Sequence, residues 1–433
     1  MLGAFANAFK TPDLRRKILF VLFIMTIFRI GSVVPAPGVN IRSIHTCLQQ
    51  AQSGANQSLY SLINLFSGGA LLQLAIFALG IMPYITSSII LQLLTVVIPR
   101  LETLKKEGQA GQAKITQYTR FLTVGLAILQ ATAFVALART PGRLFQGCQL
   151  PLLRNDNWFT ITVIVLTMTA GTGVIMWLGE LITDRGIGNG MSILIFTQIG
   201  ATFPSSLWNI RKGNGVPTFL MVIAIGLVIM AAVIFIEQAQ RRIPVQYAKR
   251  MVGRRMFGGT STYIPLKVNQ AGVIPVIFAS SLMYLPVLLS QFQQQKPWAV
   301  WIQGHFVRGD HPWYMVTFVT LIIFFTYFYV SITFNPKEVA DNMKKYGGFI
   351  PGIRAGRPTE EYLSYVLSRI TLPGALYLAL ISLIPLIAIA LVKANQNFPF
   401  GGTSILIIVG VGLDTVKQIE SQLQQRNYEG FLR

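Results

Sequence analysis

The sequence predicts an all-α polytopic membrane protein, with ten transmembrane helices in two pseudo-symmetric five-helix halves around a central pore. Three observations lead to this fold class: the composition, the lengths of the apolar runs, and the distribution of basic residues between them. The 433 residues are 52% hydrophobic and only 12% charged, whereas a soluble domain carries roughly 25% charged residues. So little charge over this length excludes a large water-soluble globule.

Apolar runs long enough to cross a membrane recur along the whole chain. A helix needs about 20 mostly apolar residues to cross a hydrocarbon core about 30 Å thick. The second run is the cleanest because it holds no charge, whereas the fifth is polar throughout and Asp414 interrupts the tenth. The predicted spans are 18–36, 75–98, 118–138, 158–179, 188–207, 216–237, 271–292, 313–334, 370–392 and 402–422.

The basic residues are divided unequally between the two sides of the membrane that these spans define. Lys and Arg number 36 against 15 Asp and Glu. Of the Lys and Arg, 25 lie on the side that holds both termini and the loops 238–270 and 335–369, when Lys417 is counted with the C-terminus. Nine lie on the other side. The positive-inside rule therefore predicts that both termini and these two loops are cytoplasmic.

A short pattern in the second span recurs in the seventh. GIMPYI at 80–85 matches GVIPVI at 272–277, and a serine pair follows each. The two copies take the same position in two five-helix halves, which we predict to comprise residues 1–207 and 208–433. Inverted repeats place working surfaces where the halves meet. The alternative is coincidence, because Gly and Pro are common in membrane helices.

Residues 58–74 are apolar but too short for a span, and Gly68 and Gly69 interrupt them. Runs of this length are typical of re-entrant or interfacial segments. Non-helical backbone at membrane depth is tolerated only where protein buries it or water surrounds it. The segment is therefore either a short helix folded back into a cavity or an amphipathic loop on the outer surface.

The predicted centre of the protein is apolar rather than charged. Transporters coupled to protons or ions usually need charged relays near the membrane midplane, and such residues are scarce here. Isoleucines fall near the middles or entrances of several spans instead, and a hydrophobic constriction can gate by dewetting. Ordinary helix packing is the alternative for any one of them. The isoleucines are Ile81, Ile85, Ile195, Ile277 and Ile407.

The two long cytoplasmic loops are basic and contain interleaved apolar and turn residues, which predicts folded surfaces. Loop 238–270 holds seven basic residues and no acidic one. Such surfaces suit phosphate backbones or acidic protein partners, although membrane orientation by itself also favours basic loops. Pro351, Gly352 and Gly356 predict that Arg354 stands on a shaped turn.

We predict no metal, no cofactor and no catalytic site. The sequence has no cluster of His, Cys, Asp and Glu with zinc-ligand spacing, no Walker loop and no nucleophile elbow. Cys47 and Cys148 are about a hundred residues apart. A disulfide cannot be argued from two such positions, so they are interpreted as unremarkable.

Seven long matches make the chain resemble the SecY family, the channel subunits of the bacterial Sec translocon. They run through the whole chain in family order, which is far more specific than any short motif. The matches are INLFSGGAL at 63–71, FALGIMPYITSSIILQLL at 77–94, RGIGNGMSI at 185–193, QYAKRMVGRR at 246–255, YIPLKVNQAGVIPVIFASS at 263–281, FIPGIRAG at 349–356 and FGGTS at 400–404.

The resemblance implies a protein-conducting channel of the general secretory pathway, with a plug at 63–72 and a lateral gate between the second and seventh helices. Met191 departs from the branched aliphatic residue usual in the family's pore ring, and Asp184 replaces a common Glu. The implied residues are, for the plug, Asn64, Leu65, Phe66, Ser67, Gly68 and Gly69; for the pore ring, Ile81, Ile85, Met191, Ile195, Ile277 and Ile407; for the gate, Thr86, Ser87, Gln92 and Asn269; and for partner docking, Arg250, Arg254, Arg255, Arg354 and Arg357.

The resemblance also implies partners and a location. The partners are the small membrane subunits SecE and SecG, the SecA motor ATPase, the ribosome through its rRNA, substrates with signal sequences, and the lipid bilayer. The location is the bacterial plasma membrane, or alternatively a thylakoid membrane. The rival function is a secondary transporter of a small solute, which would need a compact polar site at the midplane.

Overall fold

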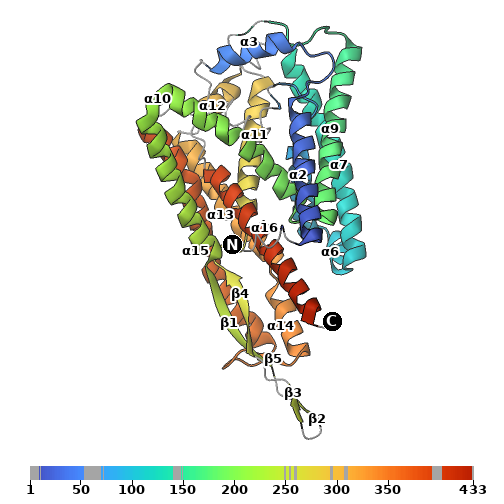
Figure 1. Ribbon diagram of the computed structural model, residues 1–433, viewed down its shortest axis with the longest axis vertical. Coiled ribbons are helices and arrows are strands. Elements are labelled where there is room, and N and C mark those ends of the chain that lie inside the picture. The colour runs from blue at the N-terminus through green and yellow to red at the C-terminus, as the bar shows by residue number, and fades with distance from the viewer. Residues whose placement is uncertain are drawn as a thin grey trace.

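The computed structural model describes residues 9, 11–52, 70–71, 73–139, 148, 150–247, 250–252, 255–257, 261–292, 296–306, 311–392 and 402–431. The described chain is mostly helical. Figure 1 shows an elongated molecule in which several long helices run between two ends, one carrying a small β-sheet and the other capped by short helices.

A helix overlaps each of the ten predicted spans. Among the described residues, five helices are long and apolar enough to cross a membrane by themselves, and α5 with α6 (Pro99–Lys106) makes a sixth candidate that is bent by 100°. The helices at the spans are α2 (Pro12–Val33), α5 (Met82–Val97), α7 (Gln109–Ala138), α9 (Trp158–Arg185), α10 (Gly190–Gln238), α11 (Ile274–Phe292), α13 (Pro312–Thr333), α15 (Arg357–Val392) and α16 (Gly402–Phe431).

The fifth and sixth predicted spans lie in one element, α10, in which two helices follow each other across a kink. We expected a loop at 208–215, but the chain there is helical except at Gly215, where φ is 82°. Glycine adopts this left-handed conformation without steric strain, so it turns the chain without a separate loop. The predicted boundary between the halves at 207/208 therefore falls inside α10, which doubles back in Figure 1.

The second predicted span becomes helical only at Met82, seven residues later than expected from its start at 75. The residues before it form buried turns. The backbone N–H of Ala36 donates to the carbonyl of Leu74 at 2.9 Å, and that of Ile76 donates to the carbonyl of Val34 at 2.9 Å. Non-helical backbone is thus satisfied by the end of α2, as membrane depth requires.

Helices α2 and α9 enclose this non-helical segment at two glycines. A Cβ on Gly31 of α2 would lie 2.1 Å from the Phe77 ring, and one on Gly171 of α9 would lie 2.1 Å from the carbonyl oxygen of Ile76. Phe28 stacks on Phe77 with ring centroids 5.9 Å apart. The small residues let the two helices approach closely enough to bury the turns.

The two basic loops fold together into one surface, which we call the platform. Strand β1 (Gln240–Tyr247) pairs with β4 (Ser261–Lys267) on one side and with β5 (Gly348–Phe349) on the other. Helix α14 (Pro336–Lys345) covers it. These short strands lie within a chain that is otherwise mostly helical, as predicted. The platform core contains Ile243, Val245, Leu266, Met343, Ile350, Leu363 and Val366.

A smaller hairpin extends from the platform. Its strands are β2 (Arg250–Val252) and β3 (Arg255–Phe257), which pair antiparallel. In Figure 1 this hairpin projects beyond the sheet at the lower end of the molecule. The prediction that loop 238–270 is folded is therefore confirmed for its described residues.

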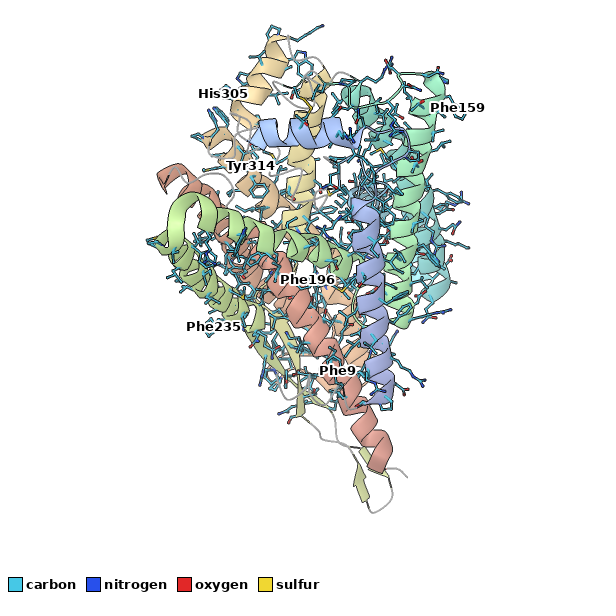
Figure 2. All side chains as sticks on the ribbon, turned by 45° about the horizontal axis from the view of Figure 1, so that its top comes forward. Phe9, Phe159, Phe196, Phe235, His305 and Tyr314 are labelled. Carbon is cyan, nitrogen blue, oxygen red and sulfur yellow. A yellow bond between two sulfur atoms is a disulfide. The ribbon has the colours of Figure 1, made fainter. Side chains whose placement is uncertain are left out.

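The opposite end carries two short helices that we did not predict, α3 (Ile41–Gln52) and α12 (Pro297–Phe306). Figure 2 shows Phe159 and His305 at this end, and Phe235 on the outer face of α10. Two exposed tryptophans, Trp298 and Trp301, lie on α12, as is common at a membrane–water interface.

A disulfide joins Cys47 of α3 to Cys148, so the interpretation of the two cysteines as unremarkable is wrong. Around it, the N–H of Asn40 donates to the carbonyl of Leu152 at 2.8 Å, and that of Arg154 donates to the carbonyl of Gly38 at 2.9 Å. We call this assembly the clasp; it comprises α3 with residues 34–40, 74–76, 148 and 152–154. Spacing along the chain could not reveal a pairing that tertiary contacts create.

The recurring pattern at 80–85 and 272–277 has the same local structure in both copies. Gly80 has φ of 56° and Gly272 has φ of 62°. In each copy the helix begins two residues later, at Met82 or Ile274. The pattern is thus a helix start that needs a left-handed residue, not a chance recurrence of glycine and proline.

Gly272→Ala should destabilise the fold by about 1–2 kcal/mol, because a Cβ strains a left-handed residue. No other atom lies within 4 Å of that Cβ position, so the loss would report the backbone alone. The matched control is Gly125→Ala in α7, which is equally open but has no positive φ. Denaturant unfolding in detergent micelles measures both. Equal stability of the two variants would contradict the role of Gly272.

Candidate functional site

The structure places all six predicted ring residues in or against one apolar cluster in the middle of the molecule. The cluster also draws residues from α2, α9, α13 and α15, so burial alone does not single the ring out. The six lie on four helices, α5, α10, α11 and α16, or, for Ile81, directly before α5. Ile81, Ile407, Ile195 and Ile85 are buried, and Met191 and Ile277 are partly buried against them.

Met191 lies where α9 and the start of α10 touch. A Cβ on Gly179 of α9 would lie 2.6 Å from the Met191 sulfur, and a Cβ on Gly190 would lie 1.8 Å from the carbonyl oxygen of Gly179. The two helices are therefore in contact through their backbones at this point. A flexible thioether fills such an irregular gap more easily than a branched side chain does.

Val273 is a residue that we did not predict for the ring. In the repeated pattern it takes the position of Ile81, so aligning the two copies could have identified it. Its side chain packs on α16, because a Cβ on Gly410 would lie 2.7 Å from Val273 Cγ2. Gly410 is three residues beyond Ile407, so Val273 brings the start of α11 against the same helix as the ring residue.

The polar gate residues of α5 satisfy their hydrogen bonds within their own helix. Thr86 Oγ1 donates to the carbonyl of Met82 at 2.9 Å, and Ser87 Oγ donates to that of Pro83 at 2.7 Å. Gln92 Nε2 contacts Ser88 Oγ at 3.4 Å. Helix α5 lies against α11, and these side chains contribute no hydrogen bond across that contact.

The fourth gate residue, Asn269, lies apart from them in a buried polar contact. Its Nδ2 donates to Glu237 Oε1 at 2.5 Å and to the carbonyl of Gly272 at 3.1 Å. Helix α15 closes the site from another side, because a Cβ on Gly374 would lie 2.4 Å from the carbonyl oxygen of Val268. Asn269 thus links the end of α10 to the start of α11.

Besides Val273, Glu237 is a residue that we did not predict for the candidate site. The sequence places it at the end of a span but gives no sign of its partner, which is 32 residues further along the chain. Nearby, Lys267 Nζ lies 3.7 Å from Asp414 Oδ1, which joins the end of β4 to α16. These contacts form where the membrane helices meet the platform.

The predicted docking arginines that the structure describes lie on the platform and its hairpin. Arg250 pairs with Phe257 across the hairpin, and Arg255 pairs with Val252. Arg354 is exposed on a turn between Gly352, with φ of 82°, and Gly356, with φ of 108°. The predicted turn is therefore confirmed.

The remaining predictions concern Arg357 and Arg254 for docking and residues 64–69 for the plug. Arg357 Nε contacts Glu361 Oε1 at 3.1 Å on the exposed surface of α15. Arg254 and the plug residues 64–69 lie outside the described residues.

Comparisons with known proteins identify the family. The SecY family model matches residues 75–416. The chain is 68% identical over 441 residues to a protein from Streptomyces griseus and 59% identical over 442 residues to one from Mycobacterium tuberculosis. Both relatives are called protein translocase subunit SecY, and each alignment covers 100% of both chains.

Solved structures share the fold. One described as a protein conducting channel has a TM-score of 0.64 at 18% sequence identity, covering 93% of this chain and 91% of that chain. Another, Sec61 in a canine ribosome-channel complex from the endoplasmic reticulum, has a TM-score of 0.58 at 16% identity with the same coverages. The two likenesses extend over nearly the whole chain.

Removing Glu237 should leave the buried amide of Asn269 with only one of its two acceptors, the carbonyl of Gly272. Glu237→Ala should therefore lower the free energy of unfolding by about 1–3 kcal/mol, and Glu237→Gln, which keeps an acceptor, by less. In a double-mutant cycle with Asn269→Ala the two losses should be non-additive by at least ~0.5 kcal/mol. The measurement is denaturant unfolding in micelles. Additive losses would show that the contact contributes nothing.

Proposed function

We propose that this chain, which belongs to the SecY family, passes unfolded polypeptides across the membrane and releases apolar helices sideways into the bilayer. Family membership makes it a protein translocase subunit and a channel, not an enzyme, and excludes the rival secondary transporter. The observation that carries the finer proposal is the meeting of aliphatic side chains from α5, α10, α11 and α16 in one cluster.

The proposed constriction is the ring of Ile81, Ile85, Met191, Ile195, Ile277 and Ile407. Its side chains are apolar, so water and ions gain no hydrogen bonds by entering, and a narrow apolar passage dewets. A passing polypeptide can displace these side chains because they are held by packing alone, without a covalent or ionic bond. We propose that the plug at 63–72 completes the seal on the side opposite the platform.

The proposed lateral gate is the contact between α5 and α11, at the meeting of the halves 1–207 and 208–433. Thr86, Ser87 and Gln92 bond within α5, so parting the helices breaks none of these bonds. An apolar segment in the channel can then move into lipid, driven by burial of its own surface at about 25 cal/mol per Å². Asn269 anchors the α11 side of the gate to Glu237.

The proposed docking surface is the platform with its hairpin. It brings basic residues of both long loops, among them Arg241 on β1 and Lys337 on α14, onto one folded unit. Such a surface suits acidic protein partners and RNA phosphates. We propose SecA and the ribosome as the partners there, with SecE and SecG as membrane partners. The platform and both termini then face the cytoplasm of a bacterial cell, and the chain lies in its plasma membrane.

Ile407→Asn should wet the constriction and weaken the closed state. We expect several-fold higher ion leak through channels reconstituted in planar bilayers, and export of precursors with weakened signal sequences. The matched control is Ile405→Asn, since Ile405 is equally buried on the same helix but outside the proposed ring. If both variants leak equally, or neither leaks, Ile407 is ordinary packing and the ring proposal fails.

Arg354→Glu should abolish most SecA-dependent translocation into vesicles while membrane insertion and abundance stay near wild type. Arg354→Lys should be partly defective, because an ammonium cannot make the paired contacts of a guanidinium. The matched control is Lys337→Glu, an exposed basic residue of α14 on the same platform, which should translocate nearly normally. Normal translocation by the Arg354→Glu variant would refute a docking role.

A further inference from the structure

The disulfide of the clasp is built into the core of one end of the molecule. The side chains of Cys47 and Cys148 are 0% and 2% exposed. Their Cα atoms are 5.5 Å apart, within the range that a disulfide requires. Ile44, Leu152 and Phe134 belong to the same buried apolar cluster. The bond is therefore shielded from water and from large reagents in the finished fold.

The bond joins parts of the chain that are separated by 101 residues in sequence. One is α3, which precedes the turns leading into α5; the other precedes α9. The antiparallel bridge Val39–Leu153 joins the residues before α3 to the segment before α9, and the bridge Pro35–Ala75 joins them to the turns before α5. The clasp thus ties α2, the approach to α5, and α9 together at one end, by hydrogen bonds and one covalent link.

The clasp lies at the end of the molecule opposite the platform (Figure 1). With the platform in the cytoplasm, as proposed above, the two cysteines are on the far side of the membrane. Disulfides form and persist there, whereas cytoplasmic thiols are kept reduced. The position of the pair is therefore chemically consistent with the orientation that the basic residues predict.

We propose that Cys47 and Cys148 are a modification site for an extracytoplasmic thiol oxidant of the disulfide-carrying class, and that the resulting bond braces the outer end of the channel. One cysteine thiolate attacks a sulfur of the oxidant's disulfide and forms a mixed disulfide. The second thiolate then attacks the sulfur of the first cysteine. Two electrons pass to the oxidant, which leaves as a dithiol, and the bond between the cysteines forms.

The burial of both sulfurs sets the order of events. A protein oxidant cannot reach them once α3 has packed, so oxidation precedes the final packing of the clasp. The brace then holds the ends of α2 and α9 fixed while α5 moves relative to α11. The bracing role rests on the proposed channel function, and oxidation on the far side rests on the proposed orientation, but the existence of the bond rests on neither.

The first test counts thiols in the full-length wild-type protein. Inverted and right-side-out membrane vesicles are first treated, or not treated, with a membrane-impermeant reductant under mildly unfolding conditions. They are then denatured in a maleimide that adds a known mass to each free thiol. We expect no labelled cysteine without reduction and two after reduction, the latter only when the clasp side faces the reductant. Two free thiols in untreated membranes would overturn the proposal, as would reduction from the platform side only.

The second test compares Cys47→Ser, Cys148→Ser and the double variant with Thr46→Ser, an exposed control on α3. Each cysteine variant breaks the same bond, so all three should lower the thermal midpoint by the same several degrees and raise ion leak equally, whereas the control should not. Unequal single variants with an additive double variant would overturn the brace. Unchanged leak with a lowered midpoint would overturn only its role in the channel.

Discussion

The constraint on which this structure depends is that backbone N–H and C=O groups have no water to bond with inside a membrane. Helices satisfy them internally. The turns before α5 cannot, and they obtain partners from Val34 and Ala36 instead. Because that segment reaches the interior without being a helix, α5 begins there, and Ile81 is its N-cap. The position of the proposed ring thus follows from how the backbone before it is satisfied.

The two copies of the short pattern use the same device and then diverge. In both, a left-handed glycine precedes a helix by two residues. Where one copy has Ile81, the other has the smaller Val273, which packs on Gly410 of α16. A larger side chain there would push α16 away. The centre is therefore built on a repeated backbone but lined asymmetrically, and the repeat alone does not determine which side chains meet.

Rigid ends enclose a middle held by apolar packing. The platform is tied by a sheet that joins two separate loops, and the clasp by backbone bridges and a disulfide. Between them, the polar side chains of α5 bond within their own helix. Packing is non-directional and can be exchanged for contact with lipid or with a passing chain, whereas the bonds at the two ends cannot. This division suits a channel that opens without unfolding.

The sequence by itself determined the membrane class, the mostly helical fold, the two basic loops and the turn at Arg354, because apolar length, charge and glycine or proline act locally. The five isoleucines that it predicted for the ring do lie in or against the central cluster, but that cluster also holds other isoleucines. The tertiary structure alone decided what depends on distant partners: the late start of α5, the joining of the two loops in one sheet, the bond from Asn269 to Glu237, and the disulfide of Cys47 and Cys148. Each needs residues far apart in the chain to meet, and no local pattern records such a meeting.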